Sequence, residues 1–447
     1  MTTFIPSPSR SLIAATGQDP NAETEPRILP AWPVLTVLWG YPIFWMVGLL
    51  PLASVIMAVP MLALLIMRRR ILLVPGILPW IGFVLWMVPS ALMIDQLGRG
   101  VGLAVRFSQF LALAIIMVYV VNARRSLSAK RIFNGLTFIW VFVIVGGYLG
   151  MLFPDVQLTM TIGRLLPGAL TENDYVKELV FPTLAEVQTP WGAEEPFVRP
   201  SAPFAYTNGW GAAMAVLTPI AIGTAVGHRT ARAMWLLVIA LVVAIPPAIA
   251  TTNRGLFIGI AGAVVYVLFC LLIRGRLLAF FWVTMLGIAA ATILMLSGFL
   301  DGIVERQETV DTTEGRGRLY AETWERTLQS PVLGYGAPRP SLWSEIHVGT
   351  QGAIWNAMFC FGLVGLVLFL SMIALGAVRT FDAPNLSAVW IHSSVVVALF
   401  LSIFYGLDRQ LVFVGIALAV LLREKYLGGS TYWLAQPVPF ARAQNEA

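Results

Sequence analysis

The sequence is poor in two things that most soluble proteins have in abundance, charged residues and cysteine. Charged residues make up 12% of the 447 residues, whereas hydrophobic residues make up 58% and the mean hydropathy is +0.80. A soluble domain carries about 25% charged residues, so this composition argues against a soluble globular protein. Long apolar runs recur along almost the whole chain and instead predict an all-α, polytopic membrane protein.

The two cysteines lie far apart inside apolar runs. Neither Cys270 nor Cys360 has a Cys, His or Asp neighbour at the spacing of a metal site. We therefore expect neither a disulfide framework nor a metal ion. We expect each thiol to pack between helices, as free cysteines usually do.

Twelve apolar segments occupy most of the sequence, and at about twenty residues per crossing they predict about twelve transmembrane helices. Their ranges are 31–48, 50–67, 72–93, 100–122, 132–153, 203–226, 233–250, 256–273, 278–299, 351–376, 388–404 and 411–422. Lysine and arginine gather in every second connection, beginning with Arg68–Arg70 and ending with Arg423 and Lys425. By the positive-inside rule both termini are then cytoplasmic, and the net charge of +6 requires no nucleic-acid partner.

The ends of the chain differ in composition from this membrane domain, which we place at 31–427. Residues 1–30 are polar, rich in Pro and Ser, and contain no apolar core of the signal-peptide type, so we expect a disordered cytoplasmic tail. Residues 428–447 are expected to form a C-terminal cytoplasmic tail. On the outer side two connections are long, 154–200 and 300–350, and connections of this length are usually functional or disordered.

The second long connection contains a stretch with helical spacing, "RLYAETWERTLQ", followed by Pro and Gly residues that end the pattern. We expect it to form a surface helix on the outer face of the membrane. One face of this helix is predicted to consist of Leu319, Thr323, Trp324 and Leu328.

Three arginines lie on the outer side, where the positive-inside rule does not favour them. Arg199 precedes an apolar segment, Arg254 sits in the hairpin "TTNRG", and Arg318 begins the surface helix. A guanidinium stays charged, and its fork of donors suits phosphate oxygens. Three of them beside helix ends would make a clamp for a diphosphate.

Each of these arginines also has a purely structural interpretation. Arg199 could pair with Glu194 or Glu195. Arg318 could form an ordinary helical pair with Glu322 at i,i+4, and the hairpin arginine could simply be solvated. Their shared position on the outer face is what favours the clamp.

A fourth arginine, Arg106, lies several residues inside an apolar segment, in "GLAVRFSQF". Charges within the membrane are usually functional. It is also close enough to the outer end for its side chain to reach the surface, and both interpretations stay open.

Four stretches of the chain, spread over about 90–425, resemble the O-antigen ligase / polysaccharide polymerase superfamily of integral membrane glycosyltransferases. "RPSAPFAYTN" is similar to the family's Arg-x-x-Gly-x-Phe-x-x-x-Asn segment: Arg199, Phe204 and Asn208 fit, and Ala202 replaces the Gly. "TTNRG" resembles its Thr-x-Ser-Arg-Gly turn. "RLYAETWERTLQSPVLGYG" resembles its Arg…Trp…Pro-x-x-Gly-x-Gly segment.

The fourth stretch lies at the outer mouth of an apolar segment. The ligases carry His-Asn, nine residues, Gly, two residues and Gly. Here Gln351-Gly352, followed at the same spacing by Gly362 and Gly365, resembles this pattern with glutamine in place of histidine.

The resemblance implies twelve helices in the plasma (inner) membrane and metal-independent, inverting glycan transfer on the outer face without a cofactor. The donor would be a polyprenyl-diphosphate-linked glycan, and the acceptor a glycan or glycolipid. The residues expected to bind the diphosphate and glycan are Arg199, Arg254, Arg318, Asn208 and Arg106.

The glutamine raises the question of the general base, because an amide can orient a hydroxyl but cannot take its proton at neutral pH. His347 could be the base, or a carboxylate such as Glu345 or Glu322. Otherwise the proton leaves late, to water or a diphosphate oxygen, while Gln351 orients the acceptor. A membrane transporter and a non-catalytic scaffold of an envelope glycan assembly are the alternative functions.

Overall fold

The computed structural model describes residues 28–68, 70–167, 177, 180–188, 196–296 and 312–427. These residues are mostly helical, as expected for an all-α membrane protein. The α-helices are α1 (Trp32–Trp39), α2 (Tyr41–Val47), α3 (Ala53–Met67), α4 (Leu78–Ser90), α5 (Leu97–Asn122), α6 (Ala129–Leu152), α9 (Thr207–His228), α10 (Ala231–Ala250), α11 (Arg254–Ile273), α12 (Leu277–Leu296), α14 (Thr312–Gln329), α15 (Ala353–Arg379), α16 (Leu386–Leu401) and α17 (Gln410–Leu427). Short 3₁₀ turns are η1 (Leu50–Leu52), η2 (Pro75–Ile77), η3 (Ala91–Met93) and η4 (Ile162–Arg164).

Within this described part, eight helices are long and apolar enough to cross a membrane. They span Leu50–Met67, Pro75–Met93, Leu97–Asn122, Ala129–Leu152, Thr207–His228, Ala231–Ala250, Arg254–Ile273 and Ala353–Arg379. Leu277–Ile293 and Leu386–Leu401 are shorter apolar helices. The predicted tails over 1–27 and 428–447 lie outside the described residues, as do parts of both long outer connections.

The first predicted segment, 31–48, does not form one membrane-length helix. It is divided into α1 and α2, which meet at Gly40. Pro42 follows at the start of α2 and has no N–H to continue the hydrogen-bond ladder of α1. The break therefore follows from backbone chemistry that hydropathy alone does not register.

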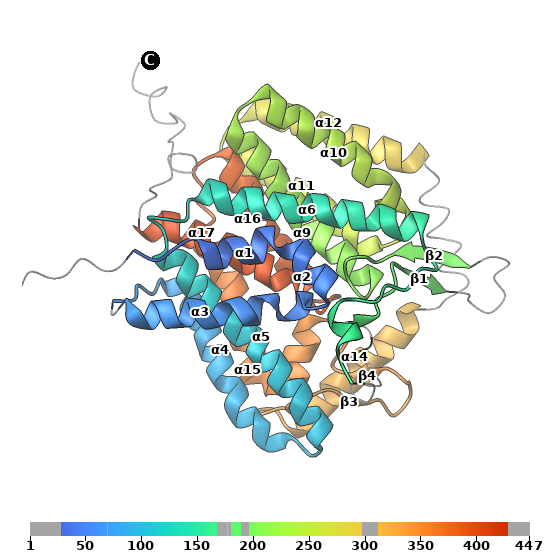
Figure 1. The fold of residues 1–447 in the computed structure, drawn as a ribbon. Helices are drawn as coiled ribbons and strands as arrows, with labels where there is room; N and C mark the ends of the chain where they lie inside the picture. Colours follow the sequence, from blue (N-terminus) through green and yellow to red (C-terminus); the bar gives the residue numbers. More distant parts are fainter. Residues whose placement is uncertain are drawn as a thin grey trace, which may run out of the picture.

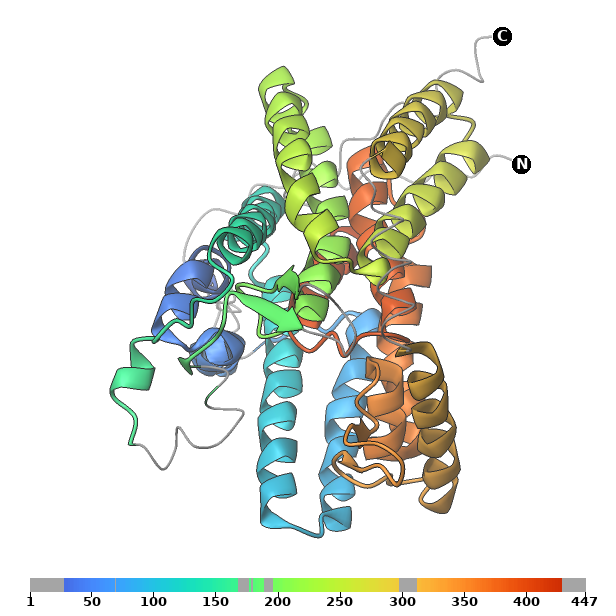
Figure 2. The same ribbon diagram turned by 90° about the vertical axis from the view of Figure 1, so that its right-hand side faces the viewer.

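The small sheets lie on the right of the molecule in Figure 1. In the view from that side, α10 and α12 splay apart, while α4, α5, α14 and α15 form a separate group (Figure 2). Helix α9 lies at the centre, packed against α6, α11 and α16. In its most apolar 18-residue stretch 83% is buried inside the protein, against 17% in the corresponding stretch of α10. Small residues permit this packing: a Cβ on Gly223 would lie 2.8 Å from the Ser387 carbonyl oxygen of α16.

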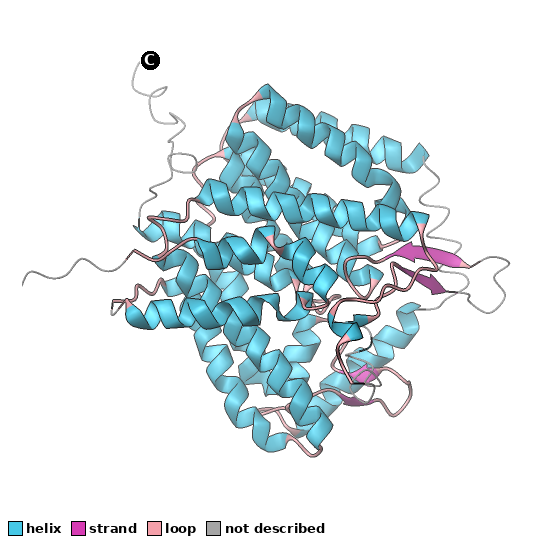
Figure 3. Ribbon diagram, in the orientation of Figure 1, coloured by secondary structure: helices cyan, strands magenta, loops and turns pink. Residues whose placement is uncertain are grey.

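The four short strands all lie at one end of the molecule (Figure 3). β1 (Ala185–Gln188) pairs antiparallel with β2 (Phe197–Pro200) in the first long outer connection. β3 (Arg339–Pro340) pairs antiparallel with β4 (His347–Val348) in the second. The long connections are thus partly ordered by their own backbone pairing.

Helix α15 is broken nine residues after its start, at Gly362, which has φ 70° and ψ −174°. The carbonyls of Phe359 and Cys360 accept hydrogen bonds from the N–H groups of Tyr335 and Gly336 in the outer connection, at 2.9 and 2.8 Å. Leu363 N–H in turn donates to the Pro331 carbonyl at 2.7 Å. The outer connection therefore completes the hydrogen bonding of a helix that is interrupted inside an apolar segment.

The predicted surface helix is present as α14, but its predicted face is divided. Leu319 and Thr323 are buried, whereas Trp324 and Leu328 are exposed. Instead, Glu322 and Thr327 complete the buried side. The threonine hydroxyls donate to carbonyls one turn earlier, so their burial leaves no unmet hydrogen bond.

Candidate functional site

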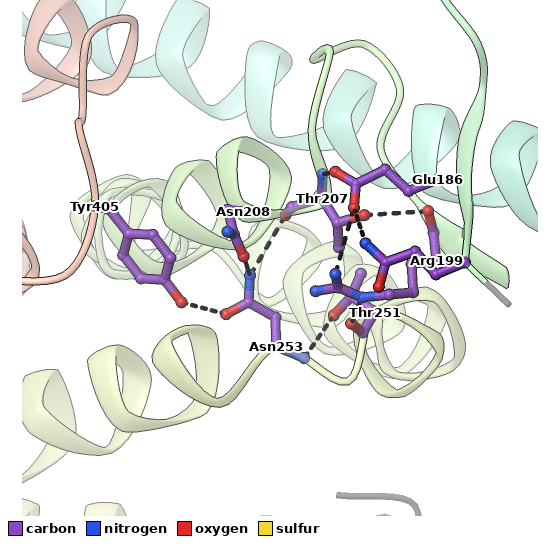
Figure 4. A network of polar contacts seen from close by, with 8 residues as sticks. Glu186, Arg199, Thr207, Asn208, Thr251, Asn253 and Tyr405 are labelled. Atoms are coloured by element: carbon purple, nitrogen blue, oxygen red, sulfur yellow. Dashed lines mark hydrogen bonds and ion pairs between the residues drawn. The ribbon is translucent and has the colours of Figure 1, made fainter. Parts of the chain in front are cut away.

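The first group of predicted site residues forms a dense polar cluster (Figure 4). Arg199, in β2, is only 4% exposed, and its Nε donates to the Thr251 carbonyl at 2.9 Å. Its Nη1 forms an ion pair with Glu186 at 3.3 Å, because β1 and β2 place these two residues opposite one another. Glu194 and Glu195, the predicted partners, lie outside the described residues.

Glu186 links this ion pair to the start of α9. Its second oxygen accepts a hydrogen bond from the Thr207 N–H at 2.7 Å, a position where a carboxylate also complements the helix dipole. The Thr207 hydroxyl donates to the Arg199 carbonyl at 3.1 Å. Arg199 and Glu186 thus fasten the first outer connection to α9 and to the α10–α11 hairpin.

Asn253 explains the composition of the "TTNRG" hairpin. It caps α11 by accepting from Leu256 N–H at 3.2 Å, and its amide donates to Asn208 at 3.5 Å (Figure 4). The Tyr405 hydroxyl donates to the Asn253 carbonyl oxygen. Gly255 is needed because a Cβ there would lie 2.0 Å from the Tyr405 oxygen. Both residues of this motif therefore have structural roles: Asn253 caps α11 and makes hydrogen bonds, and Gly255 allows close packing against Tyr405.

Arg254 begins α11 next to this cluster but takes no part in it. Its half-buried side chain forms no hydrogen bond or ion pair with any other residue in the described part of the chain. It lies outside the cavity described below.

A second group of residues surrounds a cavity of about 550 Å³ at the start of α14. Its walls come from four separate segments: the start of α9, the first turns of α14, the β3–β4 connection, and the residues before α15. The residues that line it are Asn208, Gly315, Arg316, Arg318, Leu319, Glu322, Ser341, Trp343, Ser344, Ile346 and Gln351.

Three predicted site residues, Asn208, Arg318 and Gln351, are thus brought together in this arginine cavity. Arg199, Arg254, Arg106 and His347 do not line it. Of the three arginines expected to form the diphosphate clamp, Arg318 lines this cavity, whereas Arg199 is enclosed by its own partners and Arg254 is not among the lining residues.

Arg316 is the residue that sequence reasoning missed. It makes no hydrogen bond or ion pair with the described residues, and its guanidinium faces the same cavity as Arg318. Residues two apart on a helix do not share a face, so the spacing gave no reason to place both arginines in one site. They meet there because the cavity wraps around the start of the helix.

Glu322 supplies the negative charge of the cavity, and its oxygens are already engaged. They accept from Arg326 at 3.0 Å, from the Ser341 hydroxyl at 2.5 Å and from Leu342 N–H at 3.1 Å. Burial opposes ionisation, but the bonds from Ser341 and Arg326 outweigh it and hold the pKa of Glu322 below its ordinary value. At i,i+4 on α14, Glu322 forms an ion pair with Arg326 at 3.0 Å.

Tyr405 lies between the two groups of residues. Burial raises the pKa of its hydroxyl, and the nearby guanidinium groups of Arg316 and Arg199 partly oppose that effect. The same hydroxyl bonds to Asn253, which contacts Asn208 at the cavity wall. The polar cluster therefore supports one side of the arginine cavity.

Gln351 is not a helix cap, because the residue that caps α15 is Gly352 and no side chain completes the cap. The Gln351 amide contacts Thr350 at 3.5 Å and lines the cavity. His347 lies in β4 with an exposed side chain. Arg106 lies within α5, half-buried, where it interacts electrostatically with Cys360 of the broken helix.

The chain matches no known protein-family model, and no match to it was found among curated proteins.

Proposed function

We propose that the chain transfers a glycan from a polyprenyl-diphosphate carrier to an acceptor glycan or glycolipid, in the assembly of a cell-envelope polysaccharide. The observation that carries this proposal is the pair Arg316 and Arg318 in one cavity with Asn208 and Gln351. Two guanidinium groups suit a diphosphate, while the two amides in the same cavity suit the hydroxyl groups of sugars.

The reaction requires little from the protein. The acceptor hydroxyl oxygen attacks the anomeric carbon, and the bond from that carbon to the diphosphate oxygen breaks with its electron pair. The leaving diphosphate gains negative charge, which Arg316 and Arg318 would neutralise. Attack opposite the leaving group inverts the anomeric configuration.

The acceptor proton has no obvious basic side chain to receive it among the described cavity residues. Glu322 has a lowered pKa and three donors already on its oxygens, which makes it a poor base. Gln351 can accept the hydroxyl hydrogen bond without taking the proton. In the proposal the proton therefore leaves late, to an oxygen of the departing diphosphate.

The proposed topology places the cavity on the outer face of the plasma membrane, with both termini in the cytoplasm. The arginine-rich connections support this orientation. Twelve crossings would include the eight long apolar helices together with the shorter α12 and α16, with α17 and with the α1–α2 pair.

A transporter is less well supported, although α15 contains the kind of break that transporters use for binding sites. The carbonyls of Phe359, Cys360 and Phe361 at this break are occupied by Tyr335 N–H, Gly336 N–H and the Trp86 indole. A substrate would have to displace these bonds to bind there.

The test is transfer of a labelled glycan from polyprenyl diphosphate in proteoliposomes that contain the purified protein and a glycolipid acceptor. Replacing Arg316 and Arg318 together by Ala should abolish transfer, since each charge-assisted bond is worth about 1.5–3 kcal/mol. The matched control is Arg164→Ala, which removes an exposed arginine of the first outer connection. Full transfer by the double variant would refute the proposal.

A further inference from the structure

Helix α14 leaves an apolar stripe without a protein partner. Trp324 is 47% exposed, Leu328 is 52% exposed, and Val332 in the turn after the helix is 53% exposed. Their spacing of four residues puts them along one side of the element. The buried side of the helix is already used by the cavity and by α15, so the stripe faces away from the protein.

The second half of α14 runs alongside the outer part of α15, in the same direction. At the middle of α14, the Tyr320 ring stacks on the ring of Trp355, near the start of α15, with centroids 4.3 Å apart. Beyond the end of α14, the Tyr335 ring stacks on the Phe359 ring with centroids 4.7 Å apart. The stripe therefore descends along α15 instead of lying across its outer mouth.

The depth of its lower end follows from the break in α15. Val332 lies against Gly362, where an added Cβ would come within 2.2 Å of the Val332 carbonyl oxygen. At 1.5 Å per residue, Gly362 is about 26 Å along α15 from Arg379, less than the roughly 30 Å of a hydrocarbon core. With Arg379 at the cytoplasmic boundary, Val332 lies within the outer leaflet.

The exposed surface continues from this turn onto the membrane-spanning part of α15. Val367 is one turn beyond Leu363 on the same face, and it is exposed. Leu363 is the residue whose N–H bonds to the Pro331 carbonyl, so Val367 lies one helical turn beyond the point where the turn after α14 meets α15. A side chain such as Val367, within a candidate membrane span, meets lipid.

The chain returns to the outer surface a few residues later. Arg339 donates to the Met93 carbonyl at 3.0 Å and pairs with Asp95 at 3.1 Å, in the turn between α4 and α5. Between the stripe and this anchor, the Gly334 N–H donates to the Ser330 carbonyl within the turn, and the N–H groups of Tyr335 and Gly336 donate to α15. These bonds satisfy part of the backbone of the turn without water.

We propose that residues 324–336 form a re-entrant element: the second half of α14 and the following turn enter the outer leaflet, where Trp324, Leu328 and Val332 contact lipid acyl chains. Trp324 lies nearest the headgroups, the usual depth of tryptophan. Glu325 is at the same level, where its carboxylate reaches water. This inference rests on the proposed topology but not on the proposed chemistry, so each can fail without the other.

The test attaches spin labels to introduced cysteines. The two native cysteines are buried, so we expect them not to react with the label, and the unaltered protein serves as the labelling blank. Spin labels are attached to Leu328→Cys and Val332→Cys in proteoliposomes, and their collision rates with oxygen and with a water-soluble nickel chelate are measured. Gly317→Cys is the matched control, since it lies on the same face as Leu328, three turns nearer the start of α14, in open space.

A lipid contact should give high oxygen and low nickel accessibility at both positions, with the largest depth at Val332 and high nickel accessibility at Gly317. Nickel accessibility at Val332 equal to that at Gly317 would mean that the turn is in water and would overturn the inference. Low accessibility to both reagents would mean a protein contact, such as a second copy of the chain, and would overturn it equally.

Discussion

The polar cluster around Arg199 and the arginine cavity both contain arginine and glutamate, yet the guanidinium groups have opposite environments in the two places. In the cluster, Arg199 is enclosed by Glu186 and the Thr251 carbonyl. In the cavity, Arg316 has no partner among the described residues, and the carboxylate of Glu322 is turned to Arg326 and Ser341 instead.

The difference separates two uses of the same side chain. An arginine whose donors are used by the protein stabilises the fold, whereas one that faces an open cavity keeps its donors for a ligand. Arg199, which matches the family-like motif, therefore has the environment of a residue that stabilises the fold. Arg316, which no motif singled out, has the environment of a residue that binds a ligand.

The largest effect on stability is expected for Arg199→Ala. Removing one partner of a buried ion pair leaves an uncompensated charge and should cost about 3–5 kcal/mol of the free energy of unfolding. Thermal unfolding of the purified protein measures this, with Arg164→Ala expected to change it by less than about 0.5 kcal/mol. A variant of normal stability that had lost transfer would return Arg199 to the binding site.

Arg316→Ala should show the opposite pattern, with normal stability and reduced transfer. The loss of one charge-assisted bond to the diphosphate predicts a decrease of about 10- to 150-fold, from 1.5–3 kcal/mol. Arg316→Lys should recover only part of the activity, because lysine lacks the planar fork. Equal unfolding temperatures together with equal transfer rates for the Ala variant and the unaltered protein would contradict the assignment.

Gly362→Ala tests how the cavity arginines are held. At φ 70° an alanine is strained, and its Cβ would press on the Val332 carbonyl, so we expect a loss of about 1–3 kcal/mol in stability and a matching loss of transfer. Gly317→Ala, in an open position of α14, should leave stability unchanged or raise it by about 0.5–1 kcal/mol. Unchanged stability of Gly362→Ala would mean that the docking of α14 does not depend on the break.

Gln351→Ala should have a smaller effect on transfer. If the amide only orients the acceptor, it contributes one neutral hydrogen bond, about 0.5–1.5 kcal/mol, or a few-fold to roughly tenfold in rate. Gln351→His should be tolerated.

His347→Ala should behave like the unaltered protein, since this side chain is exposed and does not line the cavity. An inactive His347→Ala variant would identify a general base that the geometry does not suggest.

The smallest expected effect is the pH dependence of the Glu322 bonds. Since folding lowers the pKa of Glu322 below its ordinary 4.5, its stabilising contribution is complete above that pH and is lost as the pH falls through the lowered value. The difference in unfolding temperature between the unaltered protein and Glu322→Gln should therefore be constant near neutral pH and shrink on acidification below 4.5. A difference that grew on acidification would have the wrong sign.

Hydropathy alone located most of the helices, because a lipid environment requires long apolar segments and these can be counted directly. It failed at 31–48, where Gly40 and Pro42 interrupt the backbone. It also missed the break at Gly362, since the residues on both sides are apolar. The face predicted for α14 is divided in the structure, because Leu319 and Thr323 are buried while Trp324 and Leu328 are exposed, and helical spacing alone does not show which part of a face meets the protein.

The candidate site was only partly accessible from the sequence. Outer-side placement singled out Arg318 and Gln351, and the resemblance added Asn208; these three do meet at one cavity. The same reasoning could not separate them from Arg199, whose partner Glu186 is thirteen residues away and reaches it only through the β1–β2 pairing.

The sequence by itself determined that this chain is a helical membrane protein, because composition and apolar length are local properties of the chain. Only the tertiary structure decided which arginines are enclosed and which face a cavity. That choice depends on contacts between residues far apart in the chain, such as Arg199 with Thr251 and Pro331 with Leu363. No spacing within a single segment encodes them.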